Sequence, residues 1–354
     1  MNVSLFISKR LRFKSWISMV SIAVSYLVMI IAVSVSAGFR QEIRSGLADL
    51  SGDIRILPPS ESVLDESRPI EKNAAYRPYI EDVDGVSQIR PVVYKAGIVK
   101  HSENIHGVLF KGVESDGGVR LAVEIPRRLA EITGLGPGDR MLTYFVGESV
   151  KARQFNVTGV YDTLVETDDK LVVYADIADL QRVNGWDEDY VSCLEIMLED
   201  VMRNEADIES ANSHIGTLIN AYSSDDQEYV IASSSVSSYP QLFDWLNLID
   251  FNVLFILVLM TIVAGFNMIS GLLIMLFENI SVIGLLKALG MTDRAISKVF
   301  LSSSAVLVLK GMALGNILAM LFCFVQGTTK VLRLNPENYF VSFVPVKMDL
   351  GLIL

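Results

Sequence analysis

Three long apolar runs divide the chain. Residues 16–39 and 251–277 contain no charged side chain, and residues 299–325 contain one, Lys310. Each run exceeds the roughly 20 apolar residues that a helix needs to cross the hydrocarbon core of a bilayer. We therefore predict an α-helical transmembrane bundle with spans over residues 16–39, 249–277 and 299–325.

The region between the first two spans is patterned as a folded domain. Residues 105–114 and 152–162 alternate apolar and polar positions, as strands do. Residues 176–185 begin with a capping Asp and end with a Gly, which predicts a short helix. Strands and helices that follow one another in this way predict a large α+β domain over residues 40–248. The run Ser233–Ser238 is interpreted as a short linker at its end.

Both ends of this domain are expected to be helical stalks. Phe39, Ile43 and Leu47 recur four residues apart and extend the first span as far as Gly52. Residues 242–249 repeat the same pattern and run without a break into the second span. We therefore expect the domain to be inserted between spans one and two on two helices that pack together. The two cysteines, Cys193 in the domain and Cys323 in the third span, are not expected to pair.

Charge is separated along the chain and gives an orientation. Residues 41–248 contain 36 acidic and 18 basic side chains, whereas the remaining residues carry a net charge of +7. Basic side chains gather in residues 9–14 and again in residues 287–298, and such segments favour the cytoplasmic side. The acidic domain is then extracytoplasmic, and its charge excludes nucleic acid as a partner. Cleavage of the first span as a signal peptide is the less favoured alternative, because this run is longer than a typical signal core.

Catalytic motifs are not apparent in the sequence. It contains no Gly-rich phosphate loop ending in Lys-Ser/Thr, and no pattern typical of a metal site or a nucleophilic triad. We therefore expect neither an enzyme nor a metal site. In the third span, Lys310 is costly if it faces lipid, so it either lines the bundle or faces a partner subunit. Gly311 and Gly315 have the spacing that allows helices to approach closely.

The segment between spans two and three is more elaborate than a turn requires. Residues 278–298 predict a short helix that ends at Gly290, followed by a restart at Thr292 or Asp293. Ile283, Leu286 and Leu289 are expected to form one exposed apolar face. Such a face fits a groove on a partner protein, and the alternative is a helix that lies on lipid headgroups.

The motif in this segment resembles the FtsX/MacB-type ABC transporter permeases, and most closely their lipoprotein-release LolC/LolE branch. The resemblance rests on "ENISVIGLLKALGM" (residues 278–291) followed by "RAISKVFL" (294–301). The strings at residues 34–43, 107–114, 155–163 and 335–346 are also similar to segments of that family.

The resemblance implies a coupling helix that docks on a separate ABC ATPase dimer, which binds ATP and Mg; no cofactor is expected on this chain. The coupling residues would be Glu278, Ile283, Gly284, Leu285, Leu286, Lys287, Ala288, Leu289 and Gly290. Further expected partners are a second permease subunit, identical or different, membrane lipids, lipoprotein cargo and a periplasmic carrier. Trp186 is the candidate contact for carrier or cargo. ATP-driven motion of the helix would then be transmitted to the periplasmic domain, which would release lipoproteins toward the outer membrane.

The implied organisation is that of a multi-pass protein of the inner membrane with a cytoplasmic N-terminus. The family has four spans, and residues 348–354 stand where a fourth would begin, so we expect it to be missing here. The alternatives within the resemblance are an FtsX-like transmitter that controls a cell-envelope hydrolase and a MacB-like efflux permease. The expected parts are a cytoplasmic amphipathic lead-in (1–15), transmembrane helix 1 (16–39), a periplasmic domain with stalks (40–248), transmembrane helix 2 (249–277), a cytoplasmic coupling segment (278–298), transmembrane helix 3 (299–325), and a periplasmic segment with the start of a fourth span (326–354).

Overall fold

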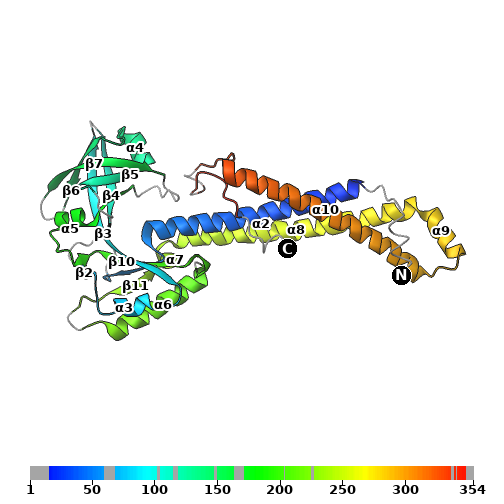
Figure 1. Cartoon of the computed structure of the whole chain (residues 1–354), viewed down its shortest axis with the longest axis horizontal. Helices are drawn as coiled ribbons and strands as arrows, with labels where there is room; N and C mark the ends of the chain where they lie inside the picture. Colours follow the sequence, from blue (N-terminus) through cyan, green and yellow to red (C-terminus); the bar gives the residue numbers. More distant parts are fainter. Residues whose placement is uncertain are drawn as a thin grey trace. The chain divides into compact units, whose positions relative to one another are not determined.

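The structure is a computed structural model, and it divides into two compact units (Figure 1). The helical unit comprises residues 1–41, 245–334 and 343–354, and the sheet unit comprises residues 42–244 and 335–342. The structure describes residues 16–59, 68–101, 104–114, 119–146, 150–162, 171–202, 204–224, 227–335, 339 and 341–347. The predicted lead-in (1–15) and the predicted start of a fourth span (348–354) lie outside these residues.

The helical unit is built from long apolar helices. They are α2 (Trp16–Ser51), α8 (Pro240–Glu278) and α10 (Asp293–Thr329), with the short α9 (Ile280–Ala288) between the last two. Among the described residues, three helices are long and apolar enough to cross a membrane, and the qualifying stretches are Met19–Ser51, Pro240–Glu278 and Asp293–Thr329.

Close contacts join α2 to both of the other long helices. Where α10 meets α2, a Cβ added to Gly311 would lie 3.0 Å from the Met19 carbonyl oxygen, and one on Gly315 would lie 2.5 Å from the Ala23 carbonyl oxygen. Without side chains at these two positions, the backbones approach more closely than any other residue allows.

The contact between α2 and α8 is polar and aromatic. Arg40 forms an ion pair with Asp250, and the Ser36 hydroxyl donates a hydrogen bond of 2.9 Å to the same carboxylate. Phe39 meets Trp245 edge to face, with ring centroids 5.8 Å apart. The prediction that the helices flanking the domain pack against each other is confirmed by these contacts.

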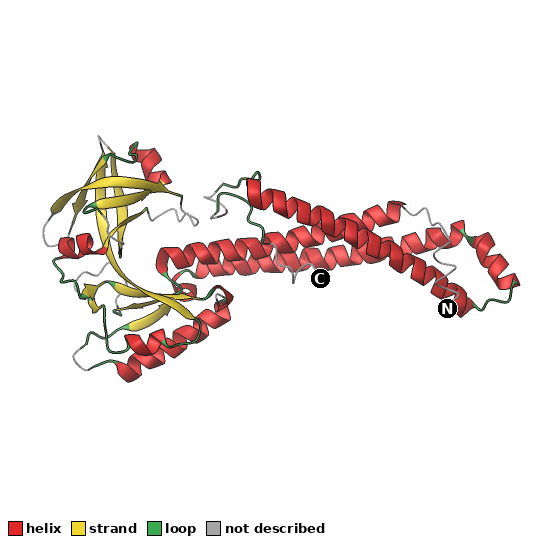
Figure 2. Cartoon of the chain, viewed as in Figure 1, coloured by secondary structure: helices red, strands yellow, loops and turns green. Residues whose placement is uncertain are grey.

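The part of the sheet unit that the structure describes contains eleven strands and several helices, and its strands are drawn in yellow in Figure 2. The described strands are β1 (Ile54–Leu57), β2 (Ile70–Glu71), β3 (Val86–His101), β4 (Asn104–Val113), β5 (Ala122–Pro126), β6 (Arg140–Phe145), β7 (Lys151–Tyr161), β8 (Val172–Asp176), β9 (Tyr190–Val191), β10 (Cys193–Leu198) and β11 (Ile231–Ser234). The helices are α3 (Arg77–Glu81), α4 (Arg127–Thr133), α5 (Ile177–Asn184), α6 (Glu205–Tyr222) and α7 (Ser235–Ser238), with a 3₁₀ turn at Asp200–Met202.

One long strand, β3, belongs to two parts of this unit. Nine strands follow the order β11-β1-β10-β3-β4-β8-β5-β7-β6, and β6 also pairs with β3. This last pairing closes β3, β4, β8, β5, β7 and β6 into a small barrel. The strands β11, β1 and β10 form an antiparallel extension beside β3. The barrel interior holds Phe110, Phe145 and Phe155, whose ring centroids are 5.1–6.0 Å apart. The pairings β4–β8 and β5–β7 are parallel and the others are antiparallel, so the mixed α and β class follows the prediction.

The two long helices that flank the sheet unit, α2 and α8, connect to neighbouring strands of its sheet. Helix α2 ends at Ser51 and β1 begins at Ile54, while β11 leads through α7 into α8. Strands β1 and β11 pair directly, with Ile54 opposite Ser234. The interpretation of Ser233–Ser238 as a linker is therefore wrong. Ser234 is buried and caps α7, because its hydroxyl accepts a hydrogen bond from the Ser237 amide.

Several helix ends lie where the sequence placed them. Gly52 and Gly185 follow α2 and α5 with φ values of +70° and +76°, a conformation that only glycine adopts readily. The Asp176 carboxylate caps α5 by accepting a hydrogen bond from the Ala178 amide. Cys193 and Cys323 are both buried and free, as expected.

Candidate functional site

The candidate site is the segment that connects α8 to α10. Helix α8 ends at Glu278, Asn279 leaves helical geometry with φ −112° and ψ 22°, and α9 begins at Ile280. Helix α10 then starts after Thr292, which has the extended backbone of an N-cap. The connection is therefore a separate helix between two long ones, as predicted.

Gly290 closes α9 with a defined hydrogen-bond pattern. Its φ is +85°, its amide donates to the Lys287 carbonyl at 2.9 Å, and the Met291 amide donates to the Leu286 carbonyl at 3.0 Å. This pair of bonds is a Schellman motif, in which a residue with positive φ satisfies the last carbonyl groups of a helix. The apolar contact that accompanies the motif is also present, since Met291 and Leu286 pack in one cluster.

The apolar side chains of α9 divide between an inner and an outer set. Ile283 and Leu286 pack against Ile296 and Phe300, two buried residues of the first turns of α10. The predicted single exposed face of Ile283, Leu286 and Leu289 is therefore wrong for its first two members. The physical reason is that the tight turn at Gly290 folds α10 back onto one side of α9.

We name the outer set the α9 outer surface. Its large members are Ile280, Leu285 and Leu289, which are 64%, 61% and 76% exposed. Between them lie smaller exposed residues, Ser281, Gly284 and Ala288. This is a shallow apolar surface, and a Cβ on Gly284 would meet no atom within 4 Å.

The charged residues of the segment lie around this surface. Lys287 forms an ion pair of 2.7 Å with Asp293, which bridges the turn between α9 and α10. Both side chains are more than half exposed, so the pair contributes little to stability. Glu278 is exposed at the end of α8.

Sequence reasoning missed the support that α10 gives to α9. Ile296 and Phe300 are four residues apart, a spacing that marks one face of a helix, and this spacing was available in the sequence. The backward turn that directs this face onto α9 was not, because Gly290 fixes the end of a helix and leaves the direction of the next one open.

The three predicted intramembrane residues divide between a buried and an exposed side of α10. Gly311 and Gly315 are buried against α2, whereas Lys310 lies on the exposed side of α10. Whether Lys310 lines the bundle or faces a partner subunit stays a prediction.

Trp186, the candidate contact for carrier or cargo, lies just after α5 in the sheet unit. Its side chain is half-buried and packs against the core, and its amide donates to the Gln181 carbonyl at 2.9 Å. Only part of the ring is therefore available to a partner, and its role stays a prediction.

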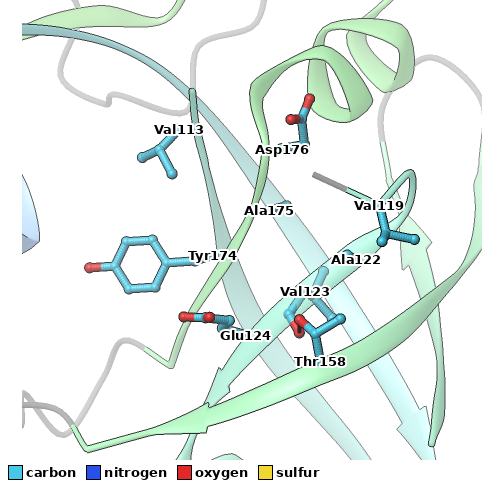
Figure 3. Close-up of a pocket in the computed structure, with 9 residues that line it drawn as sticks. All are labelled: Val113, Val119, Ala122, Val123, Glu124, Thr158, Tyr174, Ala175 and Asp176. Carbon is cyan, nitrogen blue, oxygen red and sulfur yellow. Dashed lines mark hydrogen bonds between the residues drawn. The ribbon is translucent and has the colours of Figure 1, made fainter. Parts of the chain in front are cut away.

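The sheet unit also contains an open pocket of about 490 Å³ (Figure 3). It is lined by Val113, Val119, Ala122, Val123, Glu124, Thr158, Tyr174, Ala175 and Asp176. The lining is mostly apolar, and one of its two carboxylates, Asp176, already caps α5. Such a pocket admits a small apolar group.

Comparison with known proteins agrees with this architecture. Residues 254–354, which include the whole candidate site, match the family described as FtsX-like permease C-terminal. The C-terminal part of the chain therefore carries an FtsX-like permease domain, as the motif in residues 278–291 predicts.

Two curated relatives extend the similarity to nearly the whole chain. The lipoprotein-releasing system transmembrane protein LolC of Neisseria meningitidis is 24% identical over 97% of this chain and 88% of its own length. LolC of Xylella fastidiosa is 22% identical over 96% of this chain and 87% of its own length.

Among solved structures, the extracellular domain of the ABC-type transporter YknZ from Gram-positive bacteria is similar with 15% identity and a TM-score of 0.33. It covers 51% of this chain and 99% of the other. The periplasmic region of MacB from Actinobacillus actinomycetemcomitans has 12% identity and a TM-score of 0.34, over 55% and 95% of the two chains.

Proposed function

We propose that this permease works with a separate ABC ATPase to release lipoproteins from the outer leaflet of the inner membrane toward the outer membrane. The observation that carries the proposal is the α9 outer surface, an exposed apolar patch on a helix that ends at the Gly290 turn and packs against α10. Apolar helix surfaces of this kind are used to dock into grooves of partner proteins. The names of the two relatives support lipoprotein as the cargo.

In this proposal α9 is the coupling helix, with residues 278–298 on the cytoplasmic side and the acidic sheet unit in the periplasm. ATP and Mg bind to the ATPase dimer, whose closure displaces α9. A displacement of this kind transmits free energy only if the contacts of α9 with the ATPase differ between the open and the closed state of the ATPase dimer. The permease supplies no catalytic group and acts by moving its helices and domain.

Lys310 is proposed to face a second permease subunit. It lies about eleven residues inside an apolar run, roughly 17 Å along the helix from the start of that run at Val299. A charge at this depth is strongly disfavoured in lipid.

In a complex of two permease chains that both carry Lys310→Cys, we expect the introduced cysteines to crosslink the chains. The matched position Leu321→Cys, also exposed on α10, reports random proximity. Equal crosslinking at both positions would contradict the assignment.

Depletion of this chain in its host is the test of the proposed function. We expect mature lipoproteins to accumulate in the inner membrane, and their ratio between inner and outer membrane to rise at least tenfold, measured by membrane fractionation and immunoblotting. Complementation with the intact chain should restore sorting. Normal lipoprotein sorting together with a defect in cell separation would instead indicate an FtsX-like transmitter. Normal lipoprotein sorting together with increased drug sensitivity would indicate a MacB-like efflux permease.

A further inference from the structure

The end of α2 inside the sheet unit is held by a buried group of charged and polar side chains. The Lys111 ammonium donates hydrogen bonds to the Asp49 and Leu50 carbonyl oxygens, at 3.1 and 2.7 Å, and to the Glu195 carboxylate at 2.9 Å. The Tyr94 hydroxyl donates to the other oxygen of Glu195 at 2.6 Å. We call Lys111, Glu195, Tyr94 and Arg90 the Lys111–Glu195 cluster.

Arg90 completes the cluster from the same side. Its guanidinium donates to the Ala48 carbonyl at 3.2 Å and lies 3.7 Å from the Glu195 carboxylate. Carbonyl groups in the last turn of a helix have no partner within the helix and carry partial negative charge. The two cations therefore bind three consecutive carbonyls in the last turn of α2, those of Ala48, Asp49 and Leu50, and the Ala48 carbonyl also accepts a hydrogen bond from the Gly52 amide.

The cluster draws on three neighbouring strands. Tyr94 on β3 lies directly opposite Lys111 on β4, and Arg90 on β3 lies directly opposite Glu195 on β10. The side chains of Lys111 and Glu195 are 1% and 0% exposed. Burial lowers the pKa of Lys111, and the adjacent Glu195 carboxylate opposes that shift. The last turn of α2 is thus fixed to β3 and β4 by directional bonds, and Glu195 on β10 pairs with the buried Lys111 that makes two of them.

A buried ion pair is a poor way to stabilise a fold, because desolvation of the two charges offsets most of their attraction. Its directional hydrogen bonds do, however, fix both the position and the rotation of the helix end, which apolar packing alone leaves free to slide. Gly52 adds to this constraint, because a Cβ there would lie 2.9 Å from the Cβ of Glu195. The helix end therefore cannot shift without separating buried charges.

We propose that the Lys111–Glu195 cluster is the contact that transfers movement of α2 to the sheet unit during the transport cycle. Lys111 is then a positioning residue: it holds the helix end rather than touching cargo or nucleotide. This inference rests on the proposed function. It adds the point at which a transmembrane helix acts on the sheet, through the strands β3 and β4 that also form the barrel.

The test uses the whole transporter, purified with its ATPase and reconstituted in proteoliposomes that contain a lipoprotein. The double variant Lys111→Met/Glu195→Met removes both charges together and leaves neither ion unpaired. We expect lipoprotein release to fall at least tenfold while ATP hydrolysis stays within twofold of the wild type, so that more ATP is hydrolysed per lipoprotein released. A purely structural role would lower both rates in proportion.

Folding of the variant is monitored through Cys193, which is fully buried next to the cluster. Burial raises the pKa of this thiol to about 12, so a native domain should not react with maleimide before denaturation. The matched control is Arg127→Gln/Asp162→Asn, which removes an exposed ion pair of the same unit and should leave release unchanged.

A second variant keeps the test decisive if the double variant fails to fold. Arg90 is partly exposed, so Arg90→Met should be tolerated, and we expect it to lower release threefold or more. Release within twofold of the wild type in Arg90→Met, or in a folded double variant, would overturn the inference. If the wild-type transporter itself releases no lipoprotein, the proposed function fails instead, and the two failures are distinguishable.

Discussion

Leu289→Asp is expected to weaken binding of the permease to its ATPase at least 30-fold, with loss of lipoprotein release. Leu289 is 76% exposed at the end of α9, so the substitution does not disturb the core of the permease itself. In a docked complex the new carboxylate would be buried against an apolar groove without a partner. Truncation of a central contact commonly costs about 2 kcal/mol or more, and an unpaired charge adds to that loss. Binding is measured by titration of the purified permease with the ATPase.

Two matched variants separate docking from general damage. Ser297→Asp places the same charge at an exposed position in the first turns of α10, outside the α9 outer surface, and binding should be unchanged. Leu286→Asp is less informative, because Leu286 packs against Ile296 and Phe300 and its loss would disturb the segment before any partner is met. Binding of Leu289→Asp that equals binding of Ser297→Asp would contradict the coupling role of α9.

Gly315→Ala is expected to destabilise the helical unit by about 1–3 kcal/mol, the usual cost of overpacking. The added methyl group would lie 2.5 Å from the Ala23 carbonyl oxygen, which is backbone and cannot move aside without separating α10 from α2. The measurement is the midpoint of thermal unfolding of the purified chain in detergent, which should fall by several degrees.

Gly265→Ala is the matched control in another long helix. A Cβ at Gly265 would meet no atom within 4 Å, and alanine favours the helix over glycine by up to about 1 kcal/mol. The same substitution should therefore leave the midpoint unchanged or raise it. If the two variants shift the midpoint equally, the close contact between α10 and α2 does not limit stability.

The sequence was informative where a local rule decides the outcome. The length and apolarity of the three runs predict helices long enough to cross a membrane, and the described residues contain three such helices. Asp176 and Gly185 mark helix ends through their own side-chain or backbone chemistry, so their roles could be read in advance. The resemblance to FtsX-like permeases rested on a short motif in residues 278–291, and the family match covers the same segment.

Other features could not be predicted because they depend on contacts between distant residues. Nothing local distinguishes Ile283 and Leu286, which pack inward, from Leu285 and Leu289, which remain exposed. Closure of the barrel by pairing of β3 with β6 joins segments more than 40 residues apart. The serine-rich run 233–238 has the composition of a linker, yet pairing with β1 makes its first residues the end of a strand, and the rest forms a short helix.

The amino-acid sequence alone determined the division into apolar helices and an acidic domain, together with the motif in the connecting segment. Apolarity, helix length and charge are properties of residues and their near neighbours, so they can be read along the chain. Only the tertiary structure decided which side of α9 is exposed and that Lys111 and Glu195, 84 positions apart, meet at the end of α2. The physical reason is that a charged side chain in a strand can be buried only when the fold brings an oppositely charged partner to it, and that partner is distant in sequence.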